Sequence, residues 1–337
     1  MKAIFFEKNG SVEVLKYGEV PTPEPKTSEA LVRVRACAIN NLDVQQRQGK
    51  IEGPMPHISG SDVAGVIEKI NGETSLHIGD EVVINPAIPC GVCPPCKNGL
   101  ACELVTIFGY KTQGGYAEYV TIPIGQLYPK PKSLTFPEAA AFPLTFLTAY
   151  HMLVGRANLQ KGETVFIWGA SGGLGSAGMQ IAKYLGVKII AAAKSEEDAE
   201  RLKGNGAHET VIYTKEDVEN SVKKLTSDRG VDVVFESVGA KTWNTSLMML
   251  HPYGRVVIAG TTSGDMGTQD LSEVYYRQLT ILGARMGTKA EFEKVVELFA
   301  ECKLEPVVDK VFALKDAAEA QKRMEEGKHV GKIILEI

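Results

Sequence analysis

Four cysteines crowd into one loop, with the spacing Cys90-x2-Cys93-x2-Cys96-x5-Cys102. Four thiolates this close together can surround one tetrahedral zinc ion, and Gly91 and the neighbouring prolines favour a tight turn. A loop of free thiols is the alternative interpretation, but free cysteines are usually scattered and buried. Because four cysteine ligands leave no open coordination position, the spacing predicts one structural Zn²⁺ per chain.

A glycine-rich stretch predicts a second site, for a dinucleotide. Val165–Trp168 has the pattern of a buried strand, and apolar residues then recur at helical spacing from Leu174 to Leu185. In a strand–turn–helix unit, glycines let the backbone approach a pyrophosphate, which the helix N-terminus then binds. A plain glycine turn is the alternative. The cofactor-binding residues expected in this turn are Gly169, Ser171, Gly172, Gly173, Leu174 and Gly175.

The end of the next predicted strand, Val187–Ala193, bears on the choice of cofactor. Proteins that prefer NAD usually carry Asp or Glu at this strand tip, to bind the ribose hydroxyls. Lys194 and Ser195 stand there instead and can bind a 2′-phosphate by charge and hydrogen bond. The acidic run 196–198 follows at once and opposes that phosphate. On balance the sequence favours NADPH over NADH.

Strands and helices continue to alternate up to about residue 289, which predicts a doubly wound parallel sheet of the α/β class. Ligands of such sheets bind at the carboxyl ends of the strands. Tyr213, Ser237 and Gly260 follow predicted strands at 209–213, 231–235 and 254–259. We therefore expect these three residues to line one cofactor crevice with Gly172, Lys194 and Ser195.

The rest of the chain has a different character. Residues 1–125 carry short β signals and predict a small, mainly antiparallel β domain. A helix is expected over Phe136–Met152, broken or kinked at Pro143. The tail is expected to return to the β domain through its final strand, Lys332–Ile337. The predicted domains are thus 1–125 with 290–337, and 126–289.

Composition excludes several classes of protein. The chain has 337 residues, 44% hydrophobic, with a net charge of −4 and interspersed acids and bases, which does not suggest nucleic-acid or membrane-surface binding. No apolar run approaches the roughly 20 residues that span a bilayer. The N-terminus has the pattern of a first strand and not of a signal peptide, so a cytoplasmic location is expected.

Several motifs together resemble the medium-chain dehydrogenase/reductase superfamily: the cysteine loop, GASGGLG, AINNLDVQQRQG and the terminal VGKIIL. The chain is most similar to the quinone oxidoreductase and zinc-type alcohol dehydrogenase-like branches. The resemblance implies a GroES-like catalytic domain, a Rossmann domain, an active site between them, and a homodimer or homotetramer.

The sequence departs from the family's alcohol dehydrogenases at the catalytic zinc. The three ligand positions fall on Asn40, Ser61 and Leu144, and Asp62 replaces the glutamate that follows the second ligand. None of the three is a good zinc ligand. Zinc drives alcohol oxidation by lowering the pKa of the bound hydroxyl. Reduction of a quinone or an α,β-unsaturated carbonyl needs mainly a hydride donor held at near-attack distance and a hydrogen bond to the carbonyl oxygen.

The resemblance and this departure together predict an NAD(P)H-dependent oxidoreductase that reduces a quinone or enone without catalytic zinc. Its candidate catalytic residues are Asn40, Asp62 and Thr145: Asn40 is expected to bind the carbonyl or the cofactor ribose, Asp62 to orient, and Thr145 to donate a hydrogen bond. A loop-capping role is the alternative for Asn40. The alternative functions are an alcohol dehydrogenase with an atypical metal site and a non-catalytic NADPH-binding protein. We also expect an Asp43–Arg47 ion pair and a surface His57.

Overall fold

The computed structural model describes all residues, Met1–Ile337, and divides into two compact units. The first consists of residues 1–144, 288–302 and 306–337, and the second of 145–287 and 303–305. The chain passes from one unit to the other within helix α4, Pro143–Tyr150. This division lies at residue 144, whereas the sequence suggested a boundary near 125, because the segment 126–144 carries a strand and a helix that pack with the β unit.

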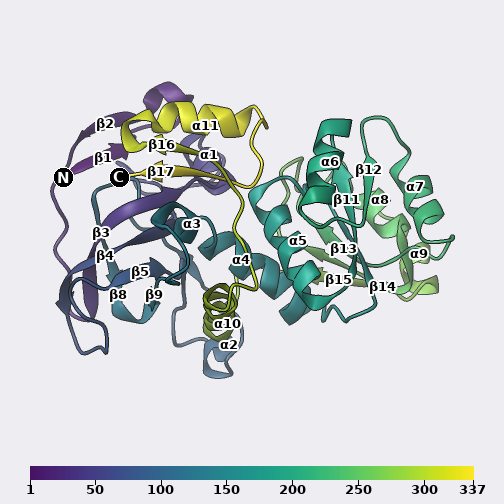
Figure 1. Ribbon diagram of the computed structural model, residues 1–337, viewed down its shortest axis with the longest axis horizontal. Helices are drawn as coiled ribbons and strands as arrows, with labels where there is room; N and C mark the ends of the chain where they lie inside the picture. Colours follow the sequence, from purple (N-terminus) through teal and green to yellow (C-terminus); the bar gives the residue numbers. More distant parts are fainter. The chain divides into compact units, whose positions relative to one another are not determined.

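The first unit is built on a seven-stranded mixed sheet whose main path runs β16-β17-β3-β4-β5-β9, with β8 paired to β3. The long strands β3 and β4 are antiparallel, as predicted, and the C-terminal strand β17 adds to β3, so the tail does complete this unit (Figure 1). The sequence missed the short strands β2, β6, β7 and β9. The strands of this unit are β1 (Lys2–Phe5), β2 (Lys16–Glu19), β3 (Glu29–Ala38), β4 (Asp62–Asn71), β5 (Glu81–Ile84), β6 (Ala87–Ile88), β7 (Thr106–Ile107), β8 (Tyr119–Pro123), β9 (Leu127–Pro129), β16 (Val308–Ala313) and β17 (Lys332–Glu336).

Five helices belong to this unit. The long helix expected near residue 140 is interrupted before Pro143, as predicted, because proline cannot donate its backbone N–H. The short helix α1 precedes the turn that leads toward β4, and α11 contacts both α1 and β17. These helices are α1 (Asn41–Arg47), α2 (Pro94–Lys97), α3 (Phe136–Ala140), α10 (Lys289–Ala300) and α11 (Ala317–Glu325).

The second unit is a six-stranded, all-parallel sheet in the order β12-β11-β10-β13-β14-β15. Successive strands run outward from β10 to one edge and then from β13 to the other, which is the doubly wound arrangement the alternation predicted. Its topological switch point lies between β10 and β13, where such sheets bind ligands. The elements are β10 (Thr164–Ile167), α5 (Gly173–Leu185), β11 (Lys188–Ala193), α6 (Glu196–Gly204), β12 (Glu209–Ile212), α7 (Val218–Leu225), β13 (Val231–Glu236), α8 (Trp243–Met248), β14 (Leu250–Ile258), α9 (Leu271–Tyr276) and β15 (Thr280–Gly283).

Each unit has its own apolar core. In the first, side chains of β3, β4 and β8 pack with Phe108, Tyr116 and the apolar face of β17. In the second, Phe166 and Trp168 pack with Ile190, Val234 and their neighbours on the sheet. No helix of the structure is long and apolar enough to cross a membrane.

Candidate active site and metal site

The four loop cysteines come together around one point. Their sulfur atoms all lie within 4.8 Å of one another, and Cys93 Sγ is 3.8 Å from Cys102 Sγ. Four sulfurs at about 2.3 Å from a tetrahedral zinc ion lie about 3.8 Å apart, so this arrangement fits zinc. The backbone N–H groups of Cys90 and Cys93 each donate to a cysteine sulfur at 3.4 Å, as they would to thiolates. The residues therefore suit a structural Zn²⁺, with no ligand position left for a substrate.

The glycine turn between β10 and α5 has the geometry the sequence predicted. Gly169 has a φ of +63°, which favours glycine, and Gly172 is the N-cap of α5. A Cβ on Gly175 would meet the carbonyl oxygen of Gly169 and lie 2.7 Å from the Cα of Ala170. The turn and the first turn of α5 can therefore pack this closely only with glycine at 175. The result is a glycine-lined helix N-terminus at the switch point, suited to a pyrophosphate.

The structure shows which partners the three acidic residues 196–198 have at the carboxyl end of β11. Asp198 is buried and turned inward, where its carboxylate accepts the hydroxyl of Ser171 at 2.7 Å and the backbone N–H of Lys194 at 3.0 Å. Ser195 is the N-cap of α6 and accepts the N–H of Asp198. Glu196 is paired with Lys215 at 3.0 Å, and Glu197 with Arg201 at 2.7 Å. The charges expected to repel a 2′-phosphate are thus largely occupied by partners within the chain.

The other predicted cofactor residues lie at the same edge of this sheet. The Tyr213 ring packs edge-on against Trp168, with 6.2 Å between ring centroids, which places it beside the end of β10. The Ser237 hydroxyl donates to the carbonyl of Trp168 at 3.4 Å. A Cβ on Gly260 would lie 2.9 Å from the carbonyl oxygen of Ser237. These contacts bring the ends of β10, β12, β13 and β14 into one region.

In the first unit, a buried polar cluster forms around Asp62. The Asn40 amide donates to Asp62 Oδ2 at 2.8 Å, the Lys332 ammonium donates to the same oxygen at 2.9 Å, and the Leu144 backbone N–H donates to Oδ1 at 2.6 Å. Lys332 also donates to Asn40 Oδ1 at 2.6 Å. Asn40 is also the N-cap of α1 and forms a capping box with Asp43, so the loop-capping interpretation holds beside the contacts to Asp62 and Lys332. Lys332 was missed, because a single lysine at the start of a strand carries no recognisable signal.

The sheet explains how residues so far apart in the sequence meet. In the antiparallel register of β17 and β3, Ile334 pairs with Ala38, so Lys332 lies level with Asn40, just beyond β3. On the other side of β3, Ala38 pairs with Asp62. Three adjacent strands therefore carry the amide, the carboxylate and the ammonium to one end of the sheet. Thr145, the third candidate catalytic residue, is buried in α4 and belongs to the second unit.

Two expectations close to this cluster are wrong. Asp43 does not pair with Arg47; its carboxylate accepts the Asn40 backbone N–H and the Tyr116 hydroxyl, both at 2.8 Å. Arg47 is fully buried and pairs instead with Glu325 of α11 at 2.5 Å. Both side chains are drawn into the core, and tertiary partners replace the helical i,i+4 pair.

His57 is fully buried and not at the surface, because the segment 57–61 crosses the core of the unit. Its Nε2 lies 3.1 Å from the carbonyl oxygen of Gly109. Burial lowers the pKa of His57 from 6.5 to about 4. The ring is therefore neutral at physiological pH, which removes it as a proton shuttle.

Comparisons with known proteins agree with this architecture. Residues 26–132 match the family model described as "Alcohol dehydrogenase GroES-like domain", and residues 173–301 match "Zinc-binding dehydrogenase". A quinone oxidoreductase of Pongo abelii is 31% identical over 99% of this chain and 97% of its own. The chain belongs to the medium-chain dehydrogenase/reductase superfamily. The prediction of a GroES-like domain and a Rossmann-like parallel sheet is thereby confirmed.

Relatives in this superfamily carry two kinds of name. An NAD-dependent alcohol dehydrogenase of Sulfolobus acidocaldarius is 31% identical over the full length of both chains. A crystal structure of an NAD-dependent alcohol dehydrogenase superposes with a TM-score of 0.96 at 41% identity, covering all of both chains. The protein is therefore an NAD(P)-dependent oxidoreductase. Its relatives include proteins named for quinone reduction and proteins named for alcohol oxidation.

The residues at the family's catalytic zinc position do not fit a metal. Both oxygens of Asp62 are taken by N–H donors, one of them the Lys332 ammonium, whose positive charge repels a cation. The Leu144 side chain has no ligating atom, and its backbone N–H is bound to Asp62. The Ser61 hydroxyl is buried without a hydrogen-bond partner, but a neutral hydroxyl alone is a weak zinc ligand. The cluster is a carboxylate whose two oxygens are occupied by hydrogen-bond donors.

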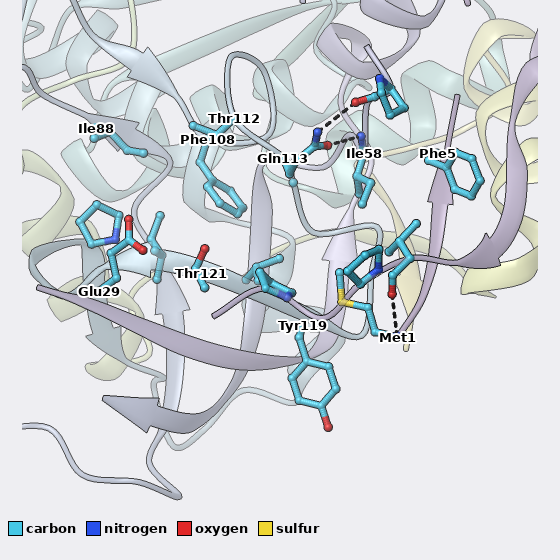
Figure 2. A pocket seen from close by; sticks show the side chains of 18 of the residues that line it. Met1, Phe5, Glu29, Ile58, Ile88, Phe108, Thr112, Gln113, Tyr119 and Thr121 are labelled. Carbon is cyan, nitrogen blue, oxygen red and sulfur yellow. Dashed lines mark hydrogen bonds between the residues drawn. The ribbon is translucent and has the colours of Figure 1, made fainter. Parts of the chain in front are cut away.

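A cavity of about 630 Å³ lies elsewhere in the first unit. Figure 2 shows Ile58, Phe108, Met1 and Tyr119 around it, with the Gln113 amide hydrogen-bonded to the backbone of Ile58 and Pro56. Its walls are mostly apolar, and no predicted site residue lines it. We assign it no part in the reaction.

Replacement of Cys102 by serine is expected to release the zinc and lower the melting temperature by about 4–10 °C, because the loop has little apolar core of its own. Metal analysis and thermal unfolding measure both effects. Cys302→Ser is the matched control, since Cys302 is exposed and lies outside the cluster. Full zinc content in Cys102→Ser would contradict the ligand assignment.

Asp43 is expected to make stability depend on pH. Burial raises its pKa from 3.8 to about 6, partly offset by the donors from Asn40 and Tyr116 and by the charge of Lys332. Between these two pH values the folded state binds more protons than the unfolded state, so the free energy of unfolding falls as pH rises, by about 3 kcal/mol in total. Asp43→Asn removes this loss.

The measurement is urea unfolding of the wild type and Asp43→Asn between pH 4 and 7.5. The stability of the variant relative to the wild type should increase with pH across the window from 3.8 to about 6. Because His57 and other titrating groups are common to both proteins, their contributions cancel in the difference. A difference that does not vary with pH would show that Asp43 is not the titrating group.

Proposed function

We propose that this protein is an NADPH-dependent reductase of quinones or α,β-unsaturated carbonyls that works without a catalytic metal. The observation that carries the proposal is the Asp62 cluster. At the family's catalytic zinc position the chain presents a carboxylate bound by an amide, a backbone N–H and the ammonium of Lys332. This arrangement disfavours a cation and leaves an amide donor.

The cofactor, when bound, supplies a hydride to the electrophilic carbon of the substrate. The chain's contribution is to hold that carbon near the hydride donor and to stabilise the negative charge that develops on the carbonyl oxygen. The Asn40 amide, 6% exposed, is the donor we assign to that oxygen. Asp62 orients the amide. Water supplies the proton that completes the reduction.

Binding of NADPH is assigned to the glycine turn and the carboxyl ends of the strands in the second unit. Gly172, Gly173 and Gly175 form the pyrophosphate site, and Lys194 with Ser195 binds the 2′-phosphate. The pairing of Glu196 with Lys215 supports this preference, because an ammonium offsets the charge of that carboxylate. NADH remains the competing cofactor, since several relatives are named NAD-dependent.

The test compares substrate classes under one set of conditions. We expect oxidation of NADPH with 1,4-benzoquinone and 2-cyclohexenone, little with cyclohexanone, and no reduction of NADP⁺ or NAD⁺ by cyclohexanol. The kcat/KM for NADPH should exceed that for NADH. Alcohol oxidation as fast as enone reduction would favour an alcohol dehydrogenase. Tight NADPH binding without turnover of any acceptor would favour a non-catalytic protein.

We also assign an oligomer contact to the free edge of the parallel sheet. Strand β15 is an edge strand, and Ile281 is 47% exposed on it. Tyr275 and Tyr276 of the neighbouring helix α9 are also exposed. An exposed apolar edge strand is a ready template for pairing with a second copy. A homodimer through β15 is therefore expected, with a homotetramer as the larger alternative.

Analytical ultracentrifugation at micromolar concentration tests this assignment. The wild type should sediment at twice the chain mass of 36.5 kDa or above, and Ile281→Lys should shift it toward the monomer. Thr280→Lys is the matched control: it adds the same charge to the same exposed strand but removes no apolar side chain. A wild type that sediments as a monomer would refute the contact.

A further inference from the structure

Lys332 is a buried lysine to which neither the cofactor site nor the hydride-transfer step assigns a part. Its side chain is 4% exposed, and its ammonium donates to Asn40 Oδ1 at 2.6 Å and to Asp62 Oδ2 at 2.9 Å. Burial of an ammonium group is costly even when it is paired with a carboxylate. A pair of apolar side chains would fill this space at less cost, which raises the question of what the charge does there.

The first consequence of the charge is the orientation of the Asn40 amide. In the observed orientation Oδ1 faces the Lys332 ammonium and Nδ2 faces the Asp62 carboxylate. A rotation by 180° would bring the NH₂ group against the ammonium and the amide oxygen against the carboxylate, and both contacts are repulsive. The two charges together therefore hold the amide in one orientation.

The second consequence concerns the donor strength of that amide. Asn40 Nδ2 carries two hydrogens, and only one of them is used by Asp62. The ammonium at 2.6 Å from Oδ1 draws electron density toward the amide oxygen, which makes the N–H groups stronger donors. Lys332 thus leaves one N–H group oriented, polarised and without a protein acceptor.

We propose that Lys332 is a positioning residue for the reduction, which holds and polarises the Asn40 amide through the Asn40–Lys332–Asp62 triangle so that its second N–H binds the carbonyl oxygen of the substrate. The proposal rests on the function proposed above. Because β17 is paired with β3, Lys332 at the start of the last strand lies beside Asn40 and can act on the reaction through the Asn40 amide.

Lys332→Met should lower kcat about 10- to 100-fold, somewhat less than removal of a complete oxyanion donor. The KM and Kd for NADPH should change by less than about threefold, since no cofactor contact is assigned to Lys332. The variant leaves the Asp62 charge buried without a partner, so its melting temperature should also fall. A loss of kcat in this variant alone would not separate positioning from structural damage.

Two further comparisons separate them. Lys332→Met combined with Asp62→Asn removes both charges; we expect the melting temperature to recover and kcat to stay low. In an Asn40→Ala background, Lys332→Met should cost less than about threefold in kcat, because its effect passes through an amide that is no longer there. Recovery of kcat together with stability, or an undiminished loss in the Asn40→Ala background, would overturn the proposal.

Lys130→Met is the matched control. Lys130 is a second buried lysine of the same unit. Its ammonium is paired with Glu81 at 3.1 Å and donates to the carbonyl oxygens of Pro131 and Leu134, none of which belongs to the triangle. We expect this variant to lose stability without losing kcat. If the wild type reduces neither an enone nor a quinone with NADPH, the proposed function has failed and not merely the role of Lys332; if the wild type is active, Asn40→Ala is slow and Lys332→Met is not, only the role of Lys332 has failed.

Discussion

Gly175→Val is expected to weaken NADPH binding by at least about 100-fold and to destabilise the second unit. A Cβ at this position would lie 2.7 Å from the Cα of Ala170 and closer still to the carbonyl oxygen of Gly169. Real Cβ atoms are not found this close to backbone atoms, so the turn or the start of α5 must move. Movement of either displaces the N–H groups that face the pyrophosphate. Quenching of intrinsic fluorescence by NADPH and thermal unfolding measure the two effects.

Gly204→Ala provides the control in the same unit. Gly204 is the last residue of α6, and a Cβ there would meet no atom within 4 Å. Alanine is the better helix former, so this variant should keep its affinity for NADPH and its stability, or gain slightly in stability. Equal affinity of Gly175→Val and the wild type would show that the cofactor does not bind at the glycine turn.

Asn40→Ala should lower kcat for enone reduction by about 100-fold, a loss of about 3 kcal/mol in transition-state stabilisation. The reason is that the amide donor to the developing oxyanion is removed, while the cofactor site lies on other residues. KM for NADPH should therefore change little. Steady-state kinetics with saturating NADPH measure the change, and the pattern expected is a fall in kcat and in kcat/KM together.

Asn85→Ala is the matched variant for Asn40→Ala. Asn85 is also a buried asparagine of the first unit, and its side chain accepts the backbone N–H of Ala87 at 3.0 Å. Its loss should cost about 1–3 kcal/mol of stability, since a buried donor is left unpaired, without a change in kcat. Equal kcat values for Asn40→Ala and the wild type would remove Asn40 from the mechanism.

The parts of the molecule that local patterns encode were predicted from the sequence. The cysteine spacing located the cluster of four sulfurs, and the order of strand, glycines and helix located the turn at Gly175, because both depend on residues close together in the chain. The interruption before Pro143 and the return of the last strand to the β unit were also predicted. Short strands such as β6 and β7 were missed, since two residues carry no periodicity.

What could not be predicted depends on contacts between distant residues. Lys332 lies 292 residues from Asn40, and only the pairing of β17 with β3 brings them together. Asp43 and Arg47 show the opposite error: their helical spacing favours an ion pair, but both are buried among other partners. His57 was expected at the surface because polar residues usually lie there. Its burial depends on contacts with distant residues, which the neighbouring sequence does not encode.

The central claim is that hydride transfer proceeds without a catalytic metal, and zinc content measured on the same preparation as turnover tests it most directly. We predict one zinc per chain, held by Cys90, Cys93, Cys96 and Cys102, and reduction of 2-cyclohexenone by NADPH that survives a chelator as long as the protein stays folded. Two zinc ions per chain, or turnover that chelation abolishes while the fold is intact, would contradict the claim and return an alcohol dehydrogenase mechanism to the site around Asp62.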